Sequence, residues 1–358
     1  MVKMGDALIR NYPKSNYIVY FDRESGMFVR MGESDRQPFW NVDGPELLDI
    51  SITNYCEKGC GFCYRASNPA GNHMQLQEYK RLMIQAKKAR VLQIALGGGN
   101  PNQHPDFINI LKETREYGMI PSYTTNGQGM TEDIYIATKK YCGALAVSWY
   151  EPHIEDCLVI EECKKFGIKI NIHFLLNLQT LEAAIQLLLK EKELLRKVNA
   201  VIFLNYKPIH SDEKWCLKEN ELLKRFLLLA KDYKECKIGF DSCMISYLTD
   251  LEKELYTETV EYCEAARFSA FIAEDSVLYP CSFMRDTQMP GISLKKVTLQ
   301  EGWQNADIFI SMREKLRKPG VQKYPIAACR ECEKYSFCHG GCQVFDINRC
   351  RKQKGIEA

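Results

Sequence analysis

Strand-like and helix-like segments alternate through the middle of this chain. The strand-like segments are short apolar or β-branched runs, at 47–53, 91–96, 119–124, 144–149, 168–175 and 200–205. The helix-like segments that follow them lie at 75–89, 105–117, 131–140, 153–166, 179–197 and 217–234. Six consecutive strand–helix units predict a parallel sheet with helices outside it. Eight units would close a full barrel, so six predict an α/β fold with an open, partial (βα)6 barrel.

Two smaller segments flank this array. Residues 17–21 and 27–31 enclose a turn with Gly26, which predicts a β-hairpin, and we expect it to decorate an edge of the main sheet. The last third of the chain is rich in cysteine and predicts a small α+β extension. We therefore expect an N-terminal hairpin at 1–45, a partial barrel at 46–236 and a cysteine-rich extension at 237–358.

The overall composition excludes several classes of protein. The 358 residues are 46% hydrophobic, which is enough for a sizeable core. A net charge of +2 gives no electrostatic reason to expect a nucleic-acid or acidic membrane partner. No run of 18 apolar residues occurs, and the N-terminus lacks the apolar core of a signal peptide. We expect a cytoplasmic protein.

Three of the sixteen cysteines lie within eight residues, directly after the first strand of the array. Cys56, Cys60 and Cys63 have C-x3-C-x2-C spacing, and thiolates on one short loop can converge on a single metal centre. Folds of this kind gather their ligands at the C-terminal ends of the strands. Three protein ligands on a four-iron cluster leave one iron open, as a chemically active cluster requires. Zinc is the alternative.

This spacing resembles the signature of radical S-adenosylmethionine (SAM) enzymes. In that family the open iron binds the amino and carboxylate groups of SAM. An electron from the reduced cluster then breaks a carbon–sulfur bond and releases a 5′-deoxyadenosyl radical. The resemblance implies a [4Fe-4S] cluster bound to SAM, together with an electron donor such as flavodoxin or ferredoxin.

Further residues at strand ends resemble segments of the same family. The sequence Gly-Gly-Gly-Asn-Pro after the second strand resembles the GGEP motif that grips the amino group of SAM, which implies contacts from Gly98, Gly99 and Asn100. Asn100 replaces the usual Glu and offers a neutral acceptor. Ser148 ends the fourth strand, either near the SAM ribose or as an ordinary strand-end cap. Phe62 takes the aromatic position near the adenine.

A second group of cysteines lies close to the C-terminus. Four cysteines with C-x2-C-x5-C-x3-C spacing would by themselves indicate tetrahedral zinc. Together with the N-terminal triad, the pattern resembles the SPASM extension of radical SAM enzymes, which usually holds two auxiliary [4Fe-4S] clusters. The resemblance implies that a distal cluster is bound by Cys329, Cys332, Cys338 and Cys350. It implies that a proximal cluster is bound by Cys263, Cys281, Cys342 and either Cys243 or an open iron that substrate could occupy.

One position of this extension departs from the family pattern. The family pattern includes two cysteines before the C-terminal group, which here are Cys263 and Cys281. A Gly usually lies five residues before the second of them, and this chain has Ser276 at that position. Asp275 and Ser276 can still form a hairpin turn, so we expect the turn to be kept.

The other titratable residues suggest no chemistry. None of the six histidines forms an i, i+4 pair or lies near a Ser or Cys nucleophile, so no catalytic residue is predicted. The remaining cysteines are expected to be mostly small buried side chains; they are Cys142, Cys157, Cys163, Cys216 and Cys236.

The resemblance covers about residues 47–350 and implies an enzyme that abstracts hydrogen from its substrate. Because the family mostly acts on peptides and proteins, we expect a ribosomal-peptide maturase that forms a thioether or carbon–carbon crosslink. A sulfatase-maturing enzyme is the nearest alternative, but it would carry an Asp directly after a proximal-cluster cysteine, where this chain has Ser282 after Cys281 and Asp286 as the next carboxylate. A small-molecule radical SAM dehydrogenase is another alternative. A non-catalytic zinc or electron-transfer module is the alternative from a different class.

Overall fold

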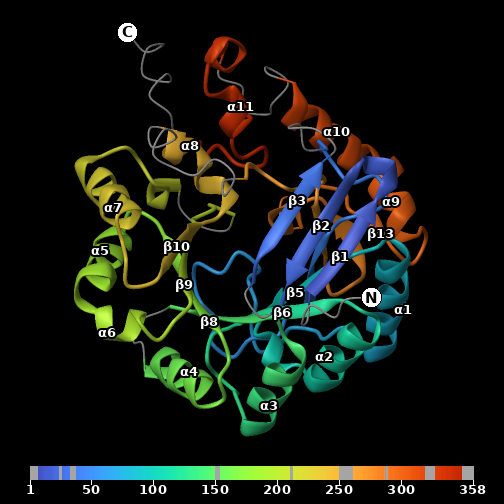
Figure 1. The fold of residues 1–358 in the computed structure, drawn as a ribbon, viewed down its shortest axis with the longest axis horizontal. Helices are drawn as coiled ribbons and strands as arrows, with labels where there is room; N and C mark the ends of the chain where they lie inside the picture. The colour runs from blue at the N-terminus through green and yellow to red at the C-terminus, as the bar shows by residue number, and fades with distance from the viewer. Residues whose placement is uncertain are drawn as a thin grey trace.

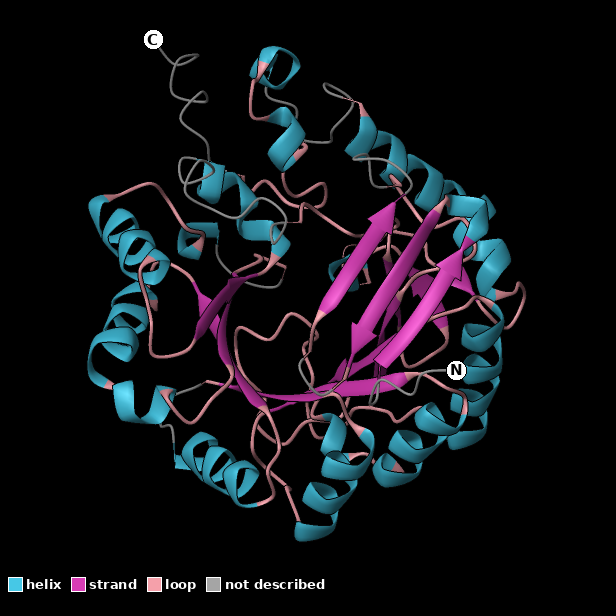
Figure 2. Ribbon diagram, viewed as in Figure 1, coloured by secondary structure: helices cyan, strands magenta, loops and turns pink. Residues whose placement is uncertain are grey.

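The computed structural model describes residues 7–23, 26–32, 38–149, 154–209, 213–249, 261–285, 287, 289–318 and 327–348. Helices form an outer arc around a curved sheet, and a separate three-stranded sheet lies on the side nearest the viewer (Figure 1). Figure 2 shows the same layering, with the strands of the curved sheet enclosed by helices.

Six parallel strands are neighbours in chain order and confirm the predicted partial (βα)6 barrel. They are β4 (Leu47–Thr53), β5 (Gln93–Gly98), β6 (Ile120–Thr125), β7 (Ala144–Ser148), β8 (Ile170–Leu176) and β9 (Ala200–Asn205). The helices after them are α1 (Leu76–Lys88), α2 (Phe107–Glu116), α3 (Glu132–Tyr141), α4 (Ile154–Lys165), α5 (Leu181–Lys190), α6 (Lys192–Leu195) and α7 (Glu221–Lys231). The single helix expected at 179–197 is divided, because the backbone of Glu191 leaves the helical region with ψ 34°.

The cysteine-rich part adds strands to both edges of this sheet. β10 (Lys237–Phe240) pairs in parallel with β9, and β11 (Ser269–Ile272) pairs in parallel with β4. Two antiparallel strands, β12 (Val277–Tyr279) and β13 (Ile292–Ser293), complete a ten-stranded sheet. The division at residue 236 stays a prediction, and the hydrogen bonds of the sheet continue across it.

The remaining elements are short and lie mostly in the extension. Its helices are α8 (Ile245–Leu248), α9 (Leu299–Asn305), α10 (Asp307–Arg317) and α11 (Tyr335–Cys338). The 3-10 turns are η1 (Pro13–Ser15), η2 (Pro101–Gln103), η3 (Glu213–Trp215), η4 (Ser242–Met244), η7 (Ser282–Met284) and η8 (Ala327–Glu331). The expected turn before β12 is present: Ser276 adopts φ +65°, the left-handed conformation that explains why glycine suits this position. No helix in the described ranges is long and apolar enough to cross a membrane.

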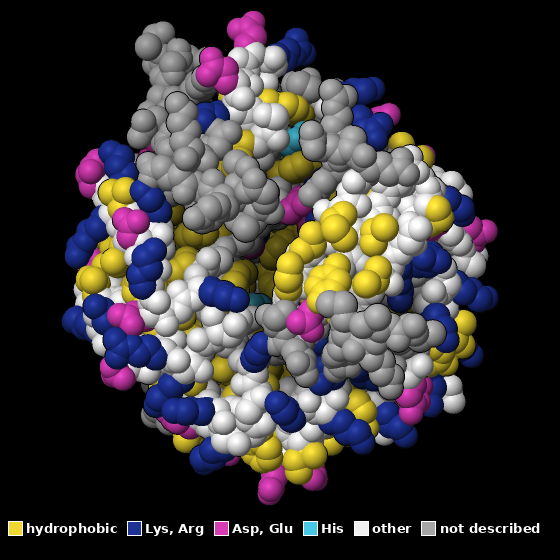
Figure 3. All heavy atoms as spheres, in the orientation of Figure 1, with side chains coloured by type: hydrophobic (Ala, Val, Ile, Leu, Met, Phe, Trp, Pro, Cys, Tyr) yellow, Lys and Arg dark blue, Asp and Glu magenta, His cyan; other side chains and the backbone are white. Residues whose placement is uncertain are grey.

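The N-terminal segment forms a sheet of its own. The predicted hairpin is present as β2 (Tyr17–Asp22) and β3 (Phe28–Gly32), and an unpredicted strand β1 (Ala7–Tyr12) pairs with β2. The expectation that the hairpin decorates an edge of the main sheet is wrong. One face of the small sheet packs instead against Leu92, Ile120 and Phe268, because burying its apolar residues there removes them from water. The opposite face carries exposed hydrophobic side chains (Figure 3), among them Ile9, Met27 and Met31.

Small and polar side chains on the inward faces of several strands leave space in the interior of the barrel. Along β8, Ile170, Ile172 and Phe174 are buried, whereas the alternate residues Asn171 and His173 face the barrel interior. Closed barrels usually fill this space with Val, Ile and Leu. The smaller, polar side chains leave a cavity here.

Arg30 of β3 joins the small sheet to the extension. Its guanidinium donates to Glu46 at 2.9 Å, to Glu261 at 2.9 Å and to Glu264 at 2.6 Å. It also lies 3.9 Å from the ring centre of Phe268. Burial raises the pKa of Glu46, and Arg30 is the main group that opposes this rise. The charge of Arg30 therefore allows Glu46 to be buried as a carboxylate.

Replacement of Arg30 by Ala should lower the free energy of unfolding by about 3–5 kcal/mol, because it leaves the buried Glu46 carboxylate without its counter-ion. Urea denaturation under anaerobic conditions measures the loss. Lys112→Ala removes an exposed pair with Glu116 on α2 and should cost about 0–1 kcal/mol. Similar losses for the two variants would contradict this role of Arg30.

Candidate active site

A cavity of about 530 Å³ lies inside the barrel, at the C-terminal ends of the strands. Cys56, Cys60 and Cys63, on the loop after β4, line it together with residues of β5 to β9. The segment after β9 and the extension contribute Lys207, Asp241 and Phe283. The three thiols of the sequence motif therefore face one enclosed space, as the βα architecture predicts.

Hydrogen bonds hold the cysteine loop in shape. The N–H of Cys63 donates to the carbonyl of Cys60 at 3.0 Å, and the N–H of Cys56 donates to the carbonyl of Asn68 at 3.2 Å. The Asn126 side chain donates to Cys56 Sγ at 3.4 Å. Burial, and then the nearby Cys63 thiol, raise the pKa of Cys60. In the described ranges no three His, Cys, Asp or Glu side chains lie close enough to hold a single metal ion, and ligation by this loop stays a prediction.

Glu274 fixes the loop relative to the sheet. Its carboxylate accepts a hydrogen bond from Ser51 of β4 at 2.9 Å and another from Arg65, two residues after Cys63, at 2.8 Å. The Arg65 side chain is only 2% exposed, so water screens this pair weakly. A strand of the barrel, the cysteine loop and the turn between β11 and β12 are therefore held by one carboxylate.

The glycine run at the end of β5 packs against the base of the cysteine loop. The N–H of Gly99 donates to the carbonyl of Thr53 at 2.7 Å, and the N–H of Asn100 donates to the carbonyl of Tyr55 at 2.9 Å. A Cβ at Gly99 would lie 1.9 Å from the Tyr55 oxygen. Gly98 and Gly99 line the cavity. The glycine run is also required by the protein itself, because the backbone of the cysteine loop passes too close to it for a side chain to fit.

The side chain of Asn100 is engaged within the protein. It is 1% exposed and is not part of the cavity wall. Its oxygen accepts from the Thr125 hydroxyl and the Asn126 N–H, each at 3.2 Å, and its amide donates to the Gln128 carbonyl at 2.9 Å. These contacts argue against the predicted direct contact with SAM and describe a brace between the loops after β5 and β6.

Phe62 and Ser148 both line the cavity, and their predicted contacts with SAM stay predictions. Ser148 ends β7 beside His173 of β8. The His173 ring lies 3.2 Å from the Thr124 hydroxyl, and burial lowers its pKa to about 4, so the ring is neutral near pH 7.

Four charged or imidazole side chains of the cavity wall were not predicted from the sequence as site residues. They are Asp49, His173, Lys207 and Asp241. Lys207 pairs with Asp241, and its ammonium lies 4.6 Å from the ring centre of Phe283. Asp49 and His173 occupy inward positions of β4 and β8, where polar and apolar residues alternate, and that alternation is the signal that could have identified them.

The predicted proximal cysteines come together. The neighbouring Cys342 thiol, followed by burial, raises the pKa of Cys243 well above its usual value. Burial, with a contribution from Cys243, raises the pKa of Cys263 to about 12, and burial followed by Cys263 and Cys243 raises that of Cys281. The Cys342 sulfur also accepts two backbone N–H groups at 3.4 Å each. Metal coordination would reverse the effect of burial, because it deprotonates a thiol outright.

The predicted distal set is only partly described. Cys329 and Cys332 lie at η8, where the N–H of Cys332 donates to the carbonyl of Cys329 at 3.4 Å, and Cys338 ends α11. Cys350 lies outside the described residues, as does Asp286. Of the cysteines outside these motifs, Cys142, Cys163 and Cys216 are buried, and Cys157 and Cys236 are partly exposed.

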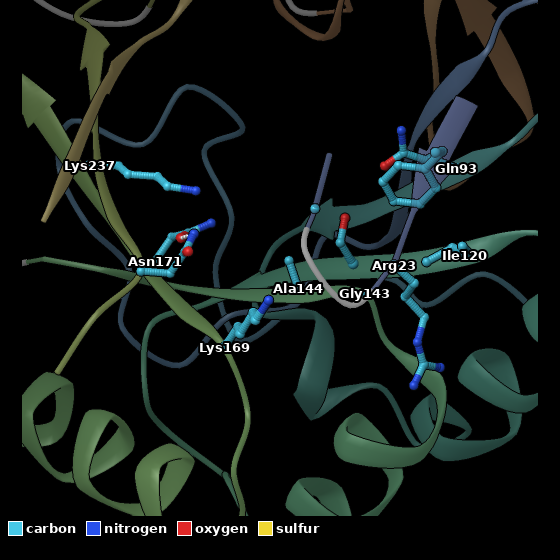
Figure 4. A pocket seen from close by; sticks show the side chains of 12 residues that line it. Arg23, Gln93, Ile120, Gly143, Ala144, Lys169, Asn171 and Lys237 are labelled. Atoms are coloured by element: carbon cyan, nitrogen blue, oxygen red, sulfur yellow. Dashed lines mark hydrogen bonds between the residues drawn. The ribbon is translucent and has the colours of Figure 1, made fainter. Parts of the chain in front are cut away.

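A second hollow, of about 230 Å³, lies at the N-terminal ends of the strands. Lys169, Asn171 and Lys237 surround it in Figure 4, with Arg23 of the hairpin on the far side. Ser122, Ala144 and Asn171 line both hollows, so one layer of small or polar side chains separates the two.

Residues 50–156, which hold the cysteine loop and the glycine run, match the family model of the radical SAM superfamily. The chain carries a radical SAM domain. This domain implies a [4Fe-4S] cluster and SAM as cofactors. The thiols of Cys56, Cys60 and Cys63 are suitable ligands for such a cluster, because all three face a cavity that is large enough to hold a ligand.

Similar proteins extend over more of the chain. A PqqA peptide cyclase of Ruegeria pomeroyi is 24% identical over 335 residues, which cover 86% of this chain and 84% of that protein. Streptococcus suis SuiB bound to its precursor peptide SuiA has the same fold, with a TM-score of 0.74, 16% identity and 97% coverage of both chains. The structure of anSMEcpe with bound AdoMet and the Kp18Cys peptide gives a TM-score of 0.63 at 15% identity, covering 83% of this chain and 89% of that one.

Replacement of Gly99 by Ala should destabilise the protein by about 1–3 kcal/mol, because the added methyl group meets the rigid Tyr55 carbonyl. Gly61→Ala is the matched control: no atom lies within 4 Å of its added methyl group, and the change should stay within about 0.5 kcal/mol. Anaerobic urea unfolding followed by circular dichroism compares them. Equal stability of the two variants would show that the backbones at Gly99 and Tyr55 can move apart at no cost.

Proposed function

We propose that this protein is a radical SAM enzyme that modifies a peptide. The observation that carries the proposal is the placement of Cys56, Cys60 and Cys63 on the wall of a cavity of about 530 Å³ inside the barrel. The likeness to a PqqA peptide cyclase over 86% of the chain supports a peptide as the substrate class. An electron-transfer module or a structural zinc site has no need of such a cavity.

Different residues of the radical SAM domain bind the cluster, contact the adenosyl group and exclude water. Cys56, Cys60 and Cys63 hold the cluster that, with SAM and one electron, supplies a 5′-deoxyadenosyl radical. The Asn126 amide orients the Cys56 sulfur through its hydrogen bond. Phe62 and Ser148 provide the wall for the adenosyl group. Phe283 and the Lys207–Asp241 pair cover the cavity from the side of the extension and help to exclude water.

The extension binds two auxiliary [4Fe-4S] clusters in this proposal. Cys243, Cys263, Cys281 and Cys342 form the proximal set, and the contact between Cys243 and Cys342 supports Cys243 as its fourth ligand. The distal set is Cys329, Cys332, Cys338 and Cys350. The domain limits predicted from the sequence, 1–45, 46–236 and 237–358, belong to the proposal, as do a cytoplasmic location and a flavodoxin or ferredoxin as electron donor.

The modification that we propose is a thioether or carbon–carbon crosslink in a ribosomal peptide. A radical SAM domain with an internal cavity suits this reaction, since the reacting side chains must be held close to SAM while water is kept out. Maturation of a sulfatase is less favoured, because Ser282 rather than an Asp follows Cys281.

Anaerobically reconstituted protein, given SAM and dithionite, should release 5′-deoxyadenosine, and the triple variant C56A/C60A/C63A should release none because its cluster has lost every protein ligand. Chromatography with mass spectrometry measures the product. Cys157→Ala, on the outer helix α4, should keep the wild-type rate. Retained cleavage in the triple variant would overturn the assignment of the cysteine loop.

The auxiliary clusters require a separate measurement. The triple variant should keep about two thirds of the wild-type iron and sulfide, because the two proposed auxiliary sites are intact in it. Variants at Cys329 or Cys332 should lose iron while retaining SAM cleavage. A preparation that contains zinc alone would contradict the proposal as a whole.

A further inference from the structure

Asp49 lies on the inward face of β4, with Phe271 of β11 in register on one side, Tyr64 nearby, and small residues on the other side. Across the sheet it is in register with Ala95 of β5, which is in register with Ser122 of β6 and then with Ala144 of β7. None of these side chains is long enough to cover a carboxylate. Within the described part of the chain, Asp49 makes no hydrogen bond and no ion pair, and it lines the cavity that holds the cysteine motif.

The charged groups near Asp49 already have partners. Arg65, the cation that acts on Asp49, pairs with Glu274 at 2.8 Å. Lys207 is the one lysine or arginine among the described residues of the cavity wall, and it pairs with Asp241. Asp49 is partly exposed, toward the cavity, and a carboxylate held away from bulk water without a partner is costly. Burial accordingly raises the pKa of Asp49 to about 7, and Arg65 opposes the rise only in part.

We propose that Asp49 binds a cationic side chain of the substrate, the ammonium of a lysine or the guanidinium of an arginine, inside the reaction cavity. This rests on the proposed function, in which the substrate is a peptide. Ser122 and Asn171, on the same wall, can donate to or accept from the bound group. Long basic side chains carry their charge on a flexible apolar stem, which suits a carboxylate set deep in a narrow cavity.

The ion pair would position the peptide for hydrogen abstraction. A contact deep in the barrel fixes one side chain, and the neighbouring backbone and side chains are then held near the cysteine loop at the C-terminal ends of the strands. Correct placement of the reacting atoms supplies a large part of the rate in such reactions. Asp49 is therefore a determinant of which peptide residue enters the cavity.

Charge-selective binding by the reconstituted protein tests this inference. N-acetyl-lysine methylamide is the probe, its uncharged counterpart N-acetyl-norleucine methylamide is the comparison, and SAM is present with the cluster oxidised so that no cleavage occurs. Saturation-transfer NMR titrations give the two affinities. The lysine probe should bind wild type more tightly than the norleucine probe. Its affinity should fall about tenfold in Asp49→Asn, because a hydrogen-bonded ion pair becomes a neutral contact.

The control variant is Asp133→Asn, which removes an exposed carboxylate from α3 and should leave binding of the lysine probe unchanged. Asp49→Asn keeps the shape of the side chain, and a circular dichroism spectrum and iron content equal to those of wild type would show that the variant is folded and loaded. Equal binding of the two probes by wild type would overturn the inference. Loss of SAM binding in Asp49→Asn would also overturn it, because Asp49 would then bind the positive charge of SAM and not a substrate side chain.

The same experiments separate this inference from the proposed function. Wild type that cleaves SAM but does not distinguish the probes leaves the enzyme assignment standing and removes the role of Asp49. Wild type that never cleaves SAM contradicts the radical SAM assignment, whichever probe binds more tightly.

Discussion

The carboxylate of Glu274 is the contact on which the arrangement of the site depends. It accepts hydrogen bonds from Ser51 of the first barrel strand and from Arg65 of the cysteine loop. Glu274 itself lies in the turn between two strands of the extension. Charge-assisted hydrogen bonds of this kind are about twice as strong as neutral ones, and the low exposure of Arg65 limits their screening. The extension is therefore coupled directly to the loop that carries Cys56, Cys60 and Cys63. Its position and the position of the thiols cannot vary independently.

The outward residues of the barrel strands stabilise the fold by packing against the helices, and the inward residues line the cavity. The outward residues of β4, Leu48, Ile50 and Ile52, are fully buried against the helices. Many inward residues of the barrel strands, such as Ala95, Ser122 and Ala144, are small or polar and leave the cavity open, and Leu175 and Leu204 complete its wall. This arrangement gives up the packed interior of a closed barrel. The N-terminal sheet compensates in part, because its apolar inner face covers Leu92 and Ile120 at the N-terminal ends of β5 and β6.

The parts of the fold set by local pattern could be predicted from the sequence. The six barrel strands follow from short apolar runs, and the cysteine loop follows from its position after the first of them. The separate N-terminal sheet and the pairing of β11 with β4 could not be predicted, because both depend on contacts between segments far apart in the chain. Asn100 shows the same limit within the site. Its place in a family motif suggested a ligand contact, but only the structure shows Thr125, Asn126 and Gln128 occupying its side chain.

The register of the strands gives the cavity two chemically different ends. Near the C-terminal ends stand the thiols, Ser148 and the neutral ring of His173, none of which brings a fixed charge other than that of a metal-bound sulfur. Two inward rows deeper, Asp49 stands between Ala95 of β5 and Phe271 of β11 and brings a carboxyl group that has no hydrogen-bond or ion-pair partner among the described residues. A ligand that spans both levels must place its reactive portion beside the cysteine loop and a group that tolerates or seeks negative charge beside β4. In the proposal made above, selectivity and reaction chemistry are separated along the strand axis, and substitutions at the level of Asp49 would alter the choice of substrate while the thiols at the other level stay in place.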